Sequence, residues 1–156
     1  MKSFAQALTG ITAVIAVFFI YMSISSNLRM TRADAYVQPA SERESAFDNI
    51  ITSARRGDPG IALLDDEPIG LITEYSFITL TYDLTNFGIM SAEWVELDIE
   101  PQMGDTLVLT TPTVDLGPFR KTQVSVVILT RDLTPAPERS VRLSYYSMGR
   151  YITLTR

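Results

Sequence analysis

The chain has 156 residues, a formal net charge of −5 at pH 7, and neither cysteine nor histidine. The lack of cysteine excludes disulfides, thiol nucleophiles and thiolate metal sites, and the lack of histidine excludes a Ser-His relay. An acidic chain also lacks the basic stripe that nucleic-acid binding requires. Composition therefore favours one compact non-enzymatic domain with about 25 to 30 residues left for an anchor, and we expect no cofactor and no nucleic-acid partner.

Residues 1–28 are expected to form an N-terminal membrane anchor. No charged residue occurs between Lys2 and Arg29, and about 20 helical residues span the roughly 30 Å hydrocarbon core of a bilayer. The side chains expected to face lipid are Phe4, Ile11, Val14, Ile15, Val17, Phe18, Phe19, Ile20 and Tyr21. A cleaved signal peptide is the alternative, because Ser23–Ser25 and Ala33–Ala35 resemble small-x-small cleavage sites. The anchor predicts a single-pass protein of the cell membrane with its C-terminal domain outside the cytoplasm.

Residues 29–60 are expected to form a charged connector with a helix over about 42–56. Ser41 and Glu44 have the spacing of a capping box, and Gly57 followed by Pro59 predicts the end of the helix. Apolar residues recur at helical spacing at Ala46, Phe47, Ile50, Ile51 and Ala54. We expect this stripe to pack on the edge of the next domain, and the alternative is an exposed stalk or assembly surface.

Residues 61–156 are expected to form an antiparallel immunoglobulin-like β-sandwich. Apolar and polar residues alternate along 77–84 (FITLTYDL) and again along 94–100, as in half-buried strands. Asn86-Phe87-Gly88 predicts a turn, because Asn and Gly tolerate a positive φ. The expected strands, seven or eight in all, are 61–64, 69–73, 77–84, 94–100, 106–110, 122–130, 140–146 and 151–155.

Part of this domain, about residues 75–131, resembles the CARDB-type immunoglobulin-like adhesion modules. The residues that carry the resemblance are Asn86-Phe87-Gly88, Ser91-Ala92, Val95, Leu97, Ile99, Leu116-Gly117-Pro118 and Val124-Ser125-Val126-Val127. The layout of one membrane helix followed by such a domain also resembles the archaellum stator subunits. These resemblances imply an adhesion or docking role in an envelope assembly.

Two acidic clusters are candidates for chemistry. Asp65, Asp66 and Glu67 could supply oxygen ligands to calcium, although a solvated turn is the simpler interpretation. Glu96, Asp98 and Glu100 lie on one strand face, which is poor geometry for an acid–base pair acting on opposite sides of a sugar. We expect them to pair across strands with Arg131, Arg142 or Arg150 instead.

The leading hypothesis is a membrane-anchored scaffold or docking module whose partners are the lipid bilayer and other protein subunits. The expected partner contacts are Trp94, Glu96, Asp98, Tyr151, Ile152 and Thr153, on an outward face and on the last strand. Trp94 is either such a contact or is covered by the 42–56 helix. The alternatives are a membrane-tethered carbohydrate-binding module and an exported ion- or solute-binding domain.

Overall fold

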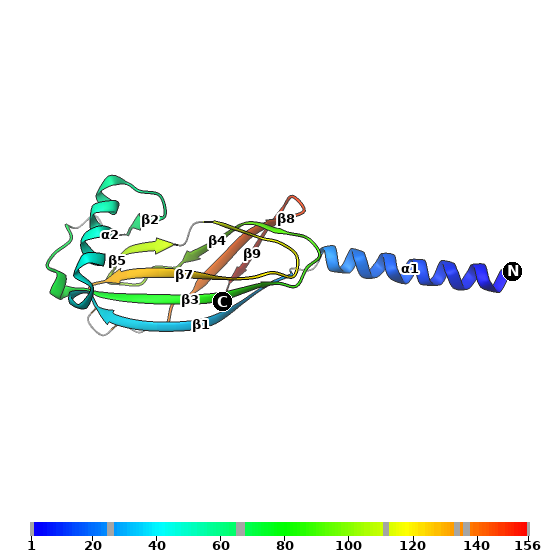
Figure 1. Ribbon diagram of the computed structural model, residues 1–156, viewed down its shortest axis with the longest axis horizontal. Helices are drawn as coiled ribbons and strands as arrows, with labels where there is room; N and C mark the ends of the chain where they lie inside the picture. Colours follow the sequence, from blue (N-terminus) through cyan, green and yellow to red (C-terminus); the bar gives the residue numbers. More distant parts are fainter. Residues whose placement is uncertain are drawn as a thin grey trace.

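A computed structural model shows two β-sheets packed into a sandwich, with a long helix projecting from one end (Figure 1). The structure describes residues 2–24, 27–64, 68–110, 113–132, 135 and 138–155. In chain order the elements are α1 (Lys2–Ile24), β1 (Leu28–Pro39), the 3₁₀ turn η1 (Ala40–Arg43), α2 (Glu44–Arg56), β2 (Ile61–Leu63), the 3₁₀ turn η2 (Ile72–Glu74), β3 (Ser76–Asn86), β4 (Ala92–Ile99), β5 (Asp105–Thr110), β6 (Val114–Leu116), β7 (Lys121–Thr130), β8 (Val141–Ser147) and β9 (Arg150–Thr155).

The predicted mainly-β fold with two antiparallel sheets is confirmed. One sheet has the strand order β1-β3-β7-β5-β2 and the other has the order β6-β4-β8-β9, and all paired neighbours run antiparallel. The described residues form nine strands rather than the seven or eight expected. The expected strand over 69–73 is wrong, because this segment ends in the turn η2.

The main core lies between the two sheets and follows from the alternation of the strands. Its largest buried side chains are Ile78, Leu80 and Leu84 of β3, Val126 and Ile128 of β7, and Val141, Leu143 and Tyr145 of β8. Successive side chains of a strand point to opposite faces, so each sheet contributes one apolar layer. A shift of one residue would turn every inward side chain toward solvent, and the core therefore fixes the register.

A second core lies on the outer face of the five-stranded sheet, under α2. Phe47, Ile51 and Ala54 of this helix pack against Phe77 and Leu129, which are the outward residues of β3 and β7 at this end. The expectation that the apolar stripe packs on the domain is confirmed, and the exposed stalk is not observed. Helix α2 covers only this end of the sheet (Figure 1). Toward the end where α1 joins, the same face carries polar residues of β3 and β7.

The two ends of α2 follow different rules. At its C-terminus, Gly57 adopts a left-handed φ of 70° and its N–H bonds to the carbonyl of Ala54, as predicted. At its N-terminus the capping box is wrong, because Ser41 lies in η1 and Arg43 occupies the cap position without a side-chain bond.

The expected connector over residues 29–60 is wrong in its first part, where residues 28–39 form β1. This strand pairs with the whole of β3, with a bulge between Arg32 and Asp34. Only Leu28 and Met30 of this strand are buried, because β1 is an edge strand and only its first residues lie over the core. Its hydrophobic alternation is therefore too weak to recognise from the sequence, and the sandwich begins directly after α1.

The turn at Asn86-Phe87-Gly88 forms, but for a different reason from the one predicted. Neither Asn86 nor Gly88 has a positive φ. Instead the buried Asn86 Oδ1 accepts a bond from the Gly88 N–H at 2.8 Å. Gly88 is required for close approach, because a Cβ there would lie 2.6 Å from the Cβ of Asn27.

Helix α1 projects away from the sandwich, at the end where β1 begins (Figure 1). In the part of the chain that the structure describes, no helix combines the length and the apolar character that a bilayer crossing requires. Phe4 belongs to α1. The other residues expected to face lipid are exposed, namely Ile11, Val14, Ile15, Val17, Phe18, Phe19, Ile20 and Tyr21.

Candidate partner-binding surface

The outward face of the four-stranded sheet holds most of the predicted contact residues. Strand pairing aligns its outward side chains in three rows, which are Glu93–Tyr146–Tyr151, Glu96–Ser144–Thr153 and Asp98–Arg142–Thr155. The face is therefore aromatic toward the α1 end, polar in the middle and charged toward the α2 end. The alternation predicted for 94–100 is confirmed, since Val95, Leu97 and Ile99 are buried between exposed neighbours.

Trp94 lies at a β-bulge that points its side chain into solvent. The pairing of β4 shifts register between Glu93 and Glu96, and Trp94 has a left-handed φ of 54°. Its backbone N–H bonds to Asp115 Oδ1 at 2.8 Å, which holds the bulge against β6. The indole residue is 68% exposed. Helix α2 packs on the other sheet, so it does not cover Trp94.

Two tyrosines complete an aromatic cluster beside Trp94. Tyr146 and Tyr151 are cross-strand partners whose ring centroids lie 5.2 Å apart at an interplanar angle of 53°. A shallow hollow of about 390 Å³ lies between Trp94, Glu93, Tyr146 and Gly149. Sequence reasoning missed Tyr146, although the adjacent pair Tyr145-Tyr146 signalled that one of the two must point outward.

Strand β9 is the edge of this sheet and supplies the other predicted contacts. Tyr151 and Thr153 point outward and are exposed, whereas Ile152 turns inward and packs against the core. The prediction that Ile152 contacts a partner is therefore not supported by its position. The free side of β9 presents backbone groups that another strand could pair with.

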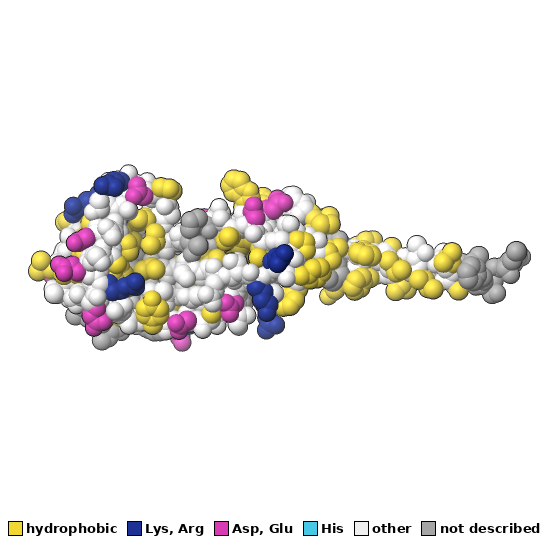
Figure 2. All heavy atoms as spheres, viewed as in Figure 1, with side chains coloured by type: hydrophobic (Ala, Val, Ile, Leu, Met, Phe, Trp, Pro, Cys, Tyr) yellow, Lys and Arg dark blue, Asp and Glu magenta, His cyan; other side chains and the backbone are white. Residues whose placement is uncertain are grey.

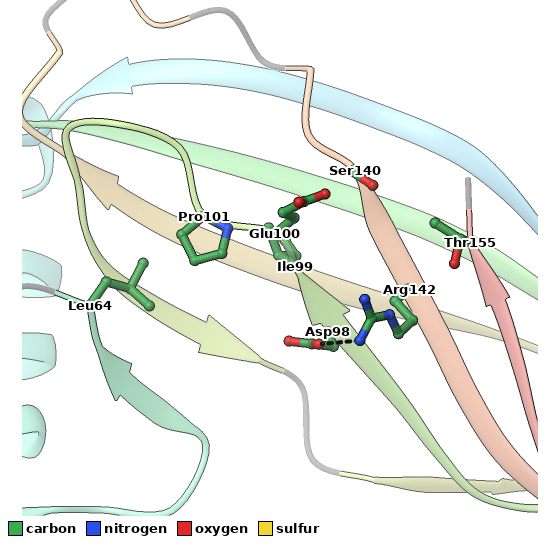
Figure 3. Close-up of a pocket in the computed structure, with 8 residues that line it drawn as sticks. All are labelled: Leu64, Asp98, Ile99, Glu100, Pro101, Ser140, Arg142 and Thr155. Atoms are coloured by element: carbon green, nitrogen blue, oxygen red, sulfur yellow. Dashed lines mark ion pairs between the residues drawn. The ribbon is translucent and has the colours of Figure 1, made fainter.

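Of the three arginines predicted to pair with the carboxylates of β4, one, Arg142, forms an ion pair with Asp98. Arg142 Nη1 lies 3.9 Å from Asp98 Oδ2, beside a cavity of about 310 Å³ between the ends of β4 and β8 (Figure 3). Arg131 is used elsewhere, since its Nε donates to the hydroxyl of Tyr75 at 3.1 Å. Arg150 lies at the β8–β9 turn, opposite Ser147.

We expect the Asp98–Arg142 pair to contribute almost nothing to stability. Both side chains are more than half exposed, and their closest approach is long. The substitution Arg142→Met should therefore change the free energy of unfolding by less than about 0.5 kcal/mol. Urea denaturation of the full-length protein in detergent measures this, and a loss above about 1 kcal/mol would contradict the interpretation of an exposed, screened pair.

The predicted calcium cluster, Asp65, Asp66 and Glu67, lies outside the described residues and stays a prediction. Among the residues that are described, no group of three acidic side chains is arranged to hold a metal ion.

No protein-family model and no curated protein matches this chain. Several solved structures resemble it, and two of them are described here. One is a FixG-related protein from Vibrio parahaemolyticus, at 12% identity and a TM-score of 0.37, with 62% of this chain and 91% of that chain covered. The other is an uncharacterized β-sandwich protein from Clostridium difficile, at 11% identity and a TM-score of 0.36, with 85% and 87% covered. Neither match assigns an activity.

Proposed function

We propose that this protein is a non-enzymatic, membrane-anchored scaffold whose sandwich docks another protein subunit of an envelope or surface assembly. The docking surface is the outward face of the four-stranded sheet together with the edge strand β9. The anchor is α1, and the sandwich lies on the outer side of the membrane.

The observation that carries the docking proposal is the exposed aromatic cluster next to an open strand edge. Trp94, Tyr146 and Tyr151 are all exposed, and large aromatic side chains are enriched at the energetic centres of protein interfaces. An edge strand adds backbone hydrogen bonds to such a contact. Glu96 lies in the row next to the cluster and Asp98 in the row beyond it, and these acidic side chains favour a partner with basic groups.

The attachment to a membrane is supported by the surface of α1. Its exposed apolar side chains, from Ile11 to Tyr21, are 48% to 70% exposed and are not covered by the sandwich. Hydrophobic side chains line the projecting helix in Figure 2. A continuous apolar surface of this kind is unfavourable in water and favourable in lipid.

The strand order supports an immunoglobulin-like assignment of the sandwich. The order β1-β3-β7-β5 corresponds to strands A-B-E-D, and β4-β8-β9 corresponds to C-F-G. The buried Asn86, at the start of the motif that resembles CARDB-type modules, bonds to three carbonyl groups of the loops around it. Such modules serve adhesion, which agrees with a docking role.

Photo-crosslinking in native membranes tests the docking surface. A photoreactive phenylalanine analogue at Thr153 is expected to give a discrete protein adduct. The double variant Trp94→Ala/Tyr151→Ala should then reduce that adduct by about tenfold or more, because truncating aromatic residues at an interface centre costs about 2 kcal/mol or more. The matched control is Tyr36→Ala on β1, an exposed tyrosine at an edge of the other sheet.

The proposal fails if Thr153 gives no adduct, or if Tyr36→Ala lowers the yield as much as the double variant does. A glycan array separates the alternative of carbohydrate binding, for which the exposed rings beside the 390 Å³ hollow are the favourable feature. Binding of a defined glycan that is lost in Trp94→Ala would support a tethered carbohydrate-binding module instead.

A further inference from the structure

The end of the sandwich that α1 joins is formed by four segments that lie together: 27–29, 86–91, 116–121 and 147–150. We refer to them as the α1-proximal tip. The Phe87 N–H bonds to the carbonyl of Asn27, and the Asn86 N–H bonds to the carbonyl of Arg120, both at 2.9 Å. Segment 147–150 is the β8–β9 turn, which follows the pairing of Tyr146 with Glu93 at the start of β4.

The tip exposes large hydrophobic side chains in three separate loops. They are Phe87 and Met90 between β3 and β4, Phe119 between β6 and β7, and Met148 between β8 and β9. Phe119 is 68% exposed. Separate exposed apolar residues are ordinary on a protein surface, but their gathering on one end of the molecule is not.

Two of these side chains, Phe119 and Met148, extend from a backbone conformation that carries an energetic cost. Trp94, Phe119 and Met148 are the non-glycine residues with a positive φ in the described chain, at 54°, 55° and 51°. Bulky residues are unfavourable in the left-handed region. In the β8–β9 turn Met148 precedes Gly149, where a two-residue hairpin turn prefers Asn before Gly. Apolar residues at such positions are candidates for a role outside folding.

The charge of the tip is opposite to that of the whole chain. The four segments contain Arg29, Arg120, Lys121 and Arg150, and none of the 18 acidic residues of a chain whose net charge is −5. All four basic residues are exposed. Arg29 and Lys121 line a surface hollow of about 490 Å³ together with Phe87, and the acid in that lining, Asp83, accepts a bond from Gln123 Nε2 at 2.9 Å.

The covalent chain keeps this tip close to α1. Helix α1 ends at Ile24 and β1 begins at Leu28, and four residue steps span at most about 14 Å. In Figure 2 hydrophobic side chains continue from the helix onto the end of the sandwich, with basic side chains beside them. A membrane that holds α1 therefore lies within reach of the tip.

We propose that the α1-proximal tip is a lipid-contact surface that rests on an anionic bilayer. Phe87, Phe119 and Met148 lie in the headgroup region, and the four basic side chains bind lipid phosphates. The inference rests on the proposed attachment of α1 to a membrane. The sandwich then contacts the membrane directly, and no spacer holds it away from the lipid. Helix α2, the end of β4 at Ile99 and the start of β8 at Val141 point away from the lipid.

Tryptophan quenching by lipids tests this contact in the full-length chain, which has a single tryptophan. In a Trp94→Phe background, Phe119→Trp reports on the tip and Met103→Trp reports on an exposed turn at the α2 end. Both chains are reconstituted into vesicles of phosphatidylcholine, with or without phosphatidylglycerol, containing lipids brominated on their acyl chains. We expect at least about twofold stronger quenching at position 119 than at 103, increased by phosphatidylglycerol and reduced by high salt.

Equal quenching at the two positions in protein that floats with the vesicles overturns the lipid contact and leaves the attachment of α1 intact. Equal quenching at positions 119 and 103 is also expected if a protein, rather than lipid, covers the tip. Failure of both chains to float with vesicles refutes the attachment itself. If quenching at position 119 does not change with phosphatidylglycerol or with salt, the basic residues of the tip do not bind lipid phosphates.

A second substitution separates lipid contact from folding. Met148→Asn, added to the Phe119→Trp chain, should lower quenching at position 119 without lowering the melting temperature, because asparagine tolerates a left-handed backbone better than methionine. Met103→Asn in the same reporter chain is the matched control and should leave the quenching unchanged. Quenching that is unaffected by Met148→Asn contradicts the participation of this turn.

Discussion

Arg139→Met is expected to lower the free energy of unfolding by about 3 to 5 kcal/mol, because it leaves a buried carboxylate without its counter-ion. The Arg139 and Asp105 side chains are 3% and 0% exposed, and the guanidinium donates to both carboxylate oxygens, at 2.9 and 3.1 Å. Asp105 begins β5 in one sheet and Arg139 precedes β8 in the other. The pair therefore joins the two sheets at the α2 end, and urea denaturation of the full-length protein in detergent measures its loss.

A double-mutant cycle distinguishes this pair from a general packing effect. Asp105→Asn keeps an oxygen for the N–H of Gln102, which Asp105 Oδ2 now accepts at 2.9 Å. Asp105→Asn/Arg139→Met should therefore be more stable than the sum of the single effects predicts, by about 2 kcal/mol. The matched control is Arg142→Met in the exposed pair. Equal effects of Arg139→Met and Arg142→Met would contradict the structural role of the buried pair.

Asn86→Ala is expected to lower the free energy of unfolding by about 2 to 4 kcal/mol, because it removes several buried hydrogen bonds at once. Asn86 Nδ2 donates to the carbonyls of Met90, Leu116 and Gly117, at 2.8, 3.0 and 3.2 Å. These bonds hold the β3–β4 loop against the β6–β7 loop, and both loops belong to the α1-proximal tip. Thermal or urea denaturation of the full-length chain measures the loss.

Two further variants make the Asn86 prediction specific. Asn86→Asp keeps the acceptor for Gly88 but faces a carboxylate with three carbonyl oxygens, so it should be at least as destabilising as alanine. Asn49→Ala, on the exposed face of α2, should change the free energy of unfolding by less than about 0.5 kcal/mol. An Asn86→Ala effect no larger than that of Asn49→Ala would show that the two loops hold together without this side chain.

The strands that the sequence predicts well are those buried on one face or on both. The alternation along 77–84 and 94–100 corresponds to β3 and β4, since water on one side and core on the other impose a period of two. Strand β1 does not follow this rule, because it is an edge strand of its sheet and only two of its side chains are buried. The short β6 was missed for a similar reason, since it offers three residues and one buried side chain.

In the candidate surfaces, too, some residue positions follow from local alternation and others depend on the tertiary structure. The outward positions of Trp94, Glu96 and Asp98 follow from alternation, but the β-bulge at Trp94 is set by the pairing of β4 with two neighbours. The inward side of Ile152 depends on which face of β9 meets the core. The α1-proximal tip combines four segments that are far apart in the chain, so no local pattern signals it.

The amino-acid composition, with no cysteine, no histidine and a net charge of −5, is enough to predict which classes of chemistry are excluded. The periodicity of apolar residues is enough to predict one apolar helix followed by a mainly-β domain. Those properties depend on residue types and local periodicity, which a single chain displays directly. Only the tertiary structure decided that the sandwich follows α1 without a spacer, that Asp105 meets Arg139, and that basic and apolar loops share one end. Contacts between distant residues depend on sheet order and register, and these are set by the packing of the whole core.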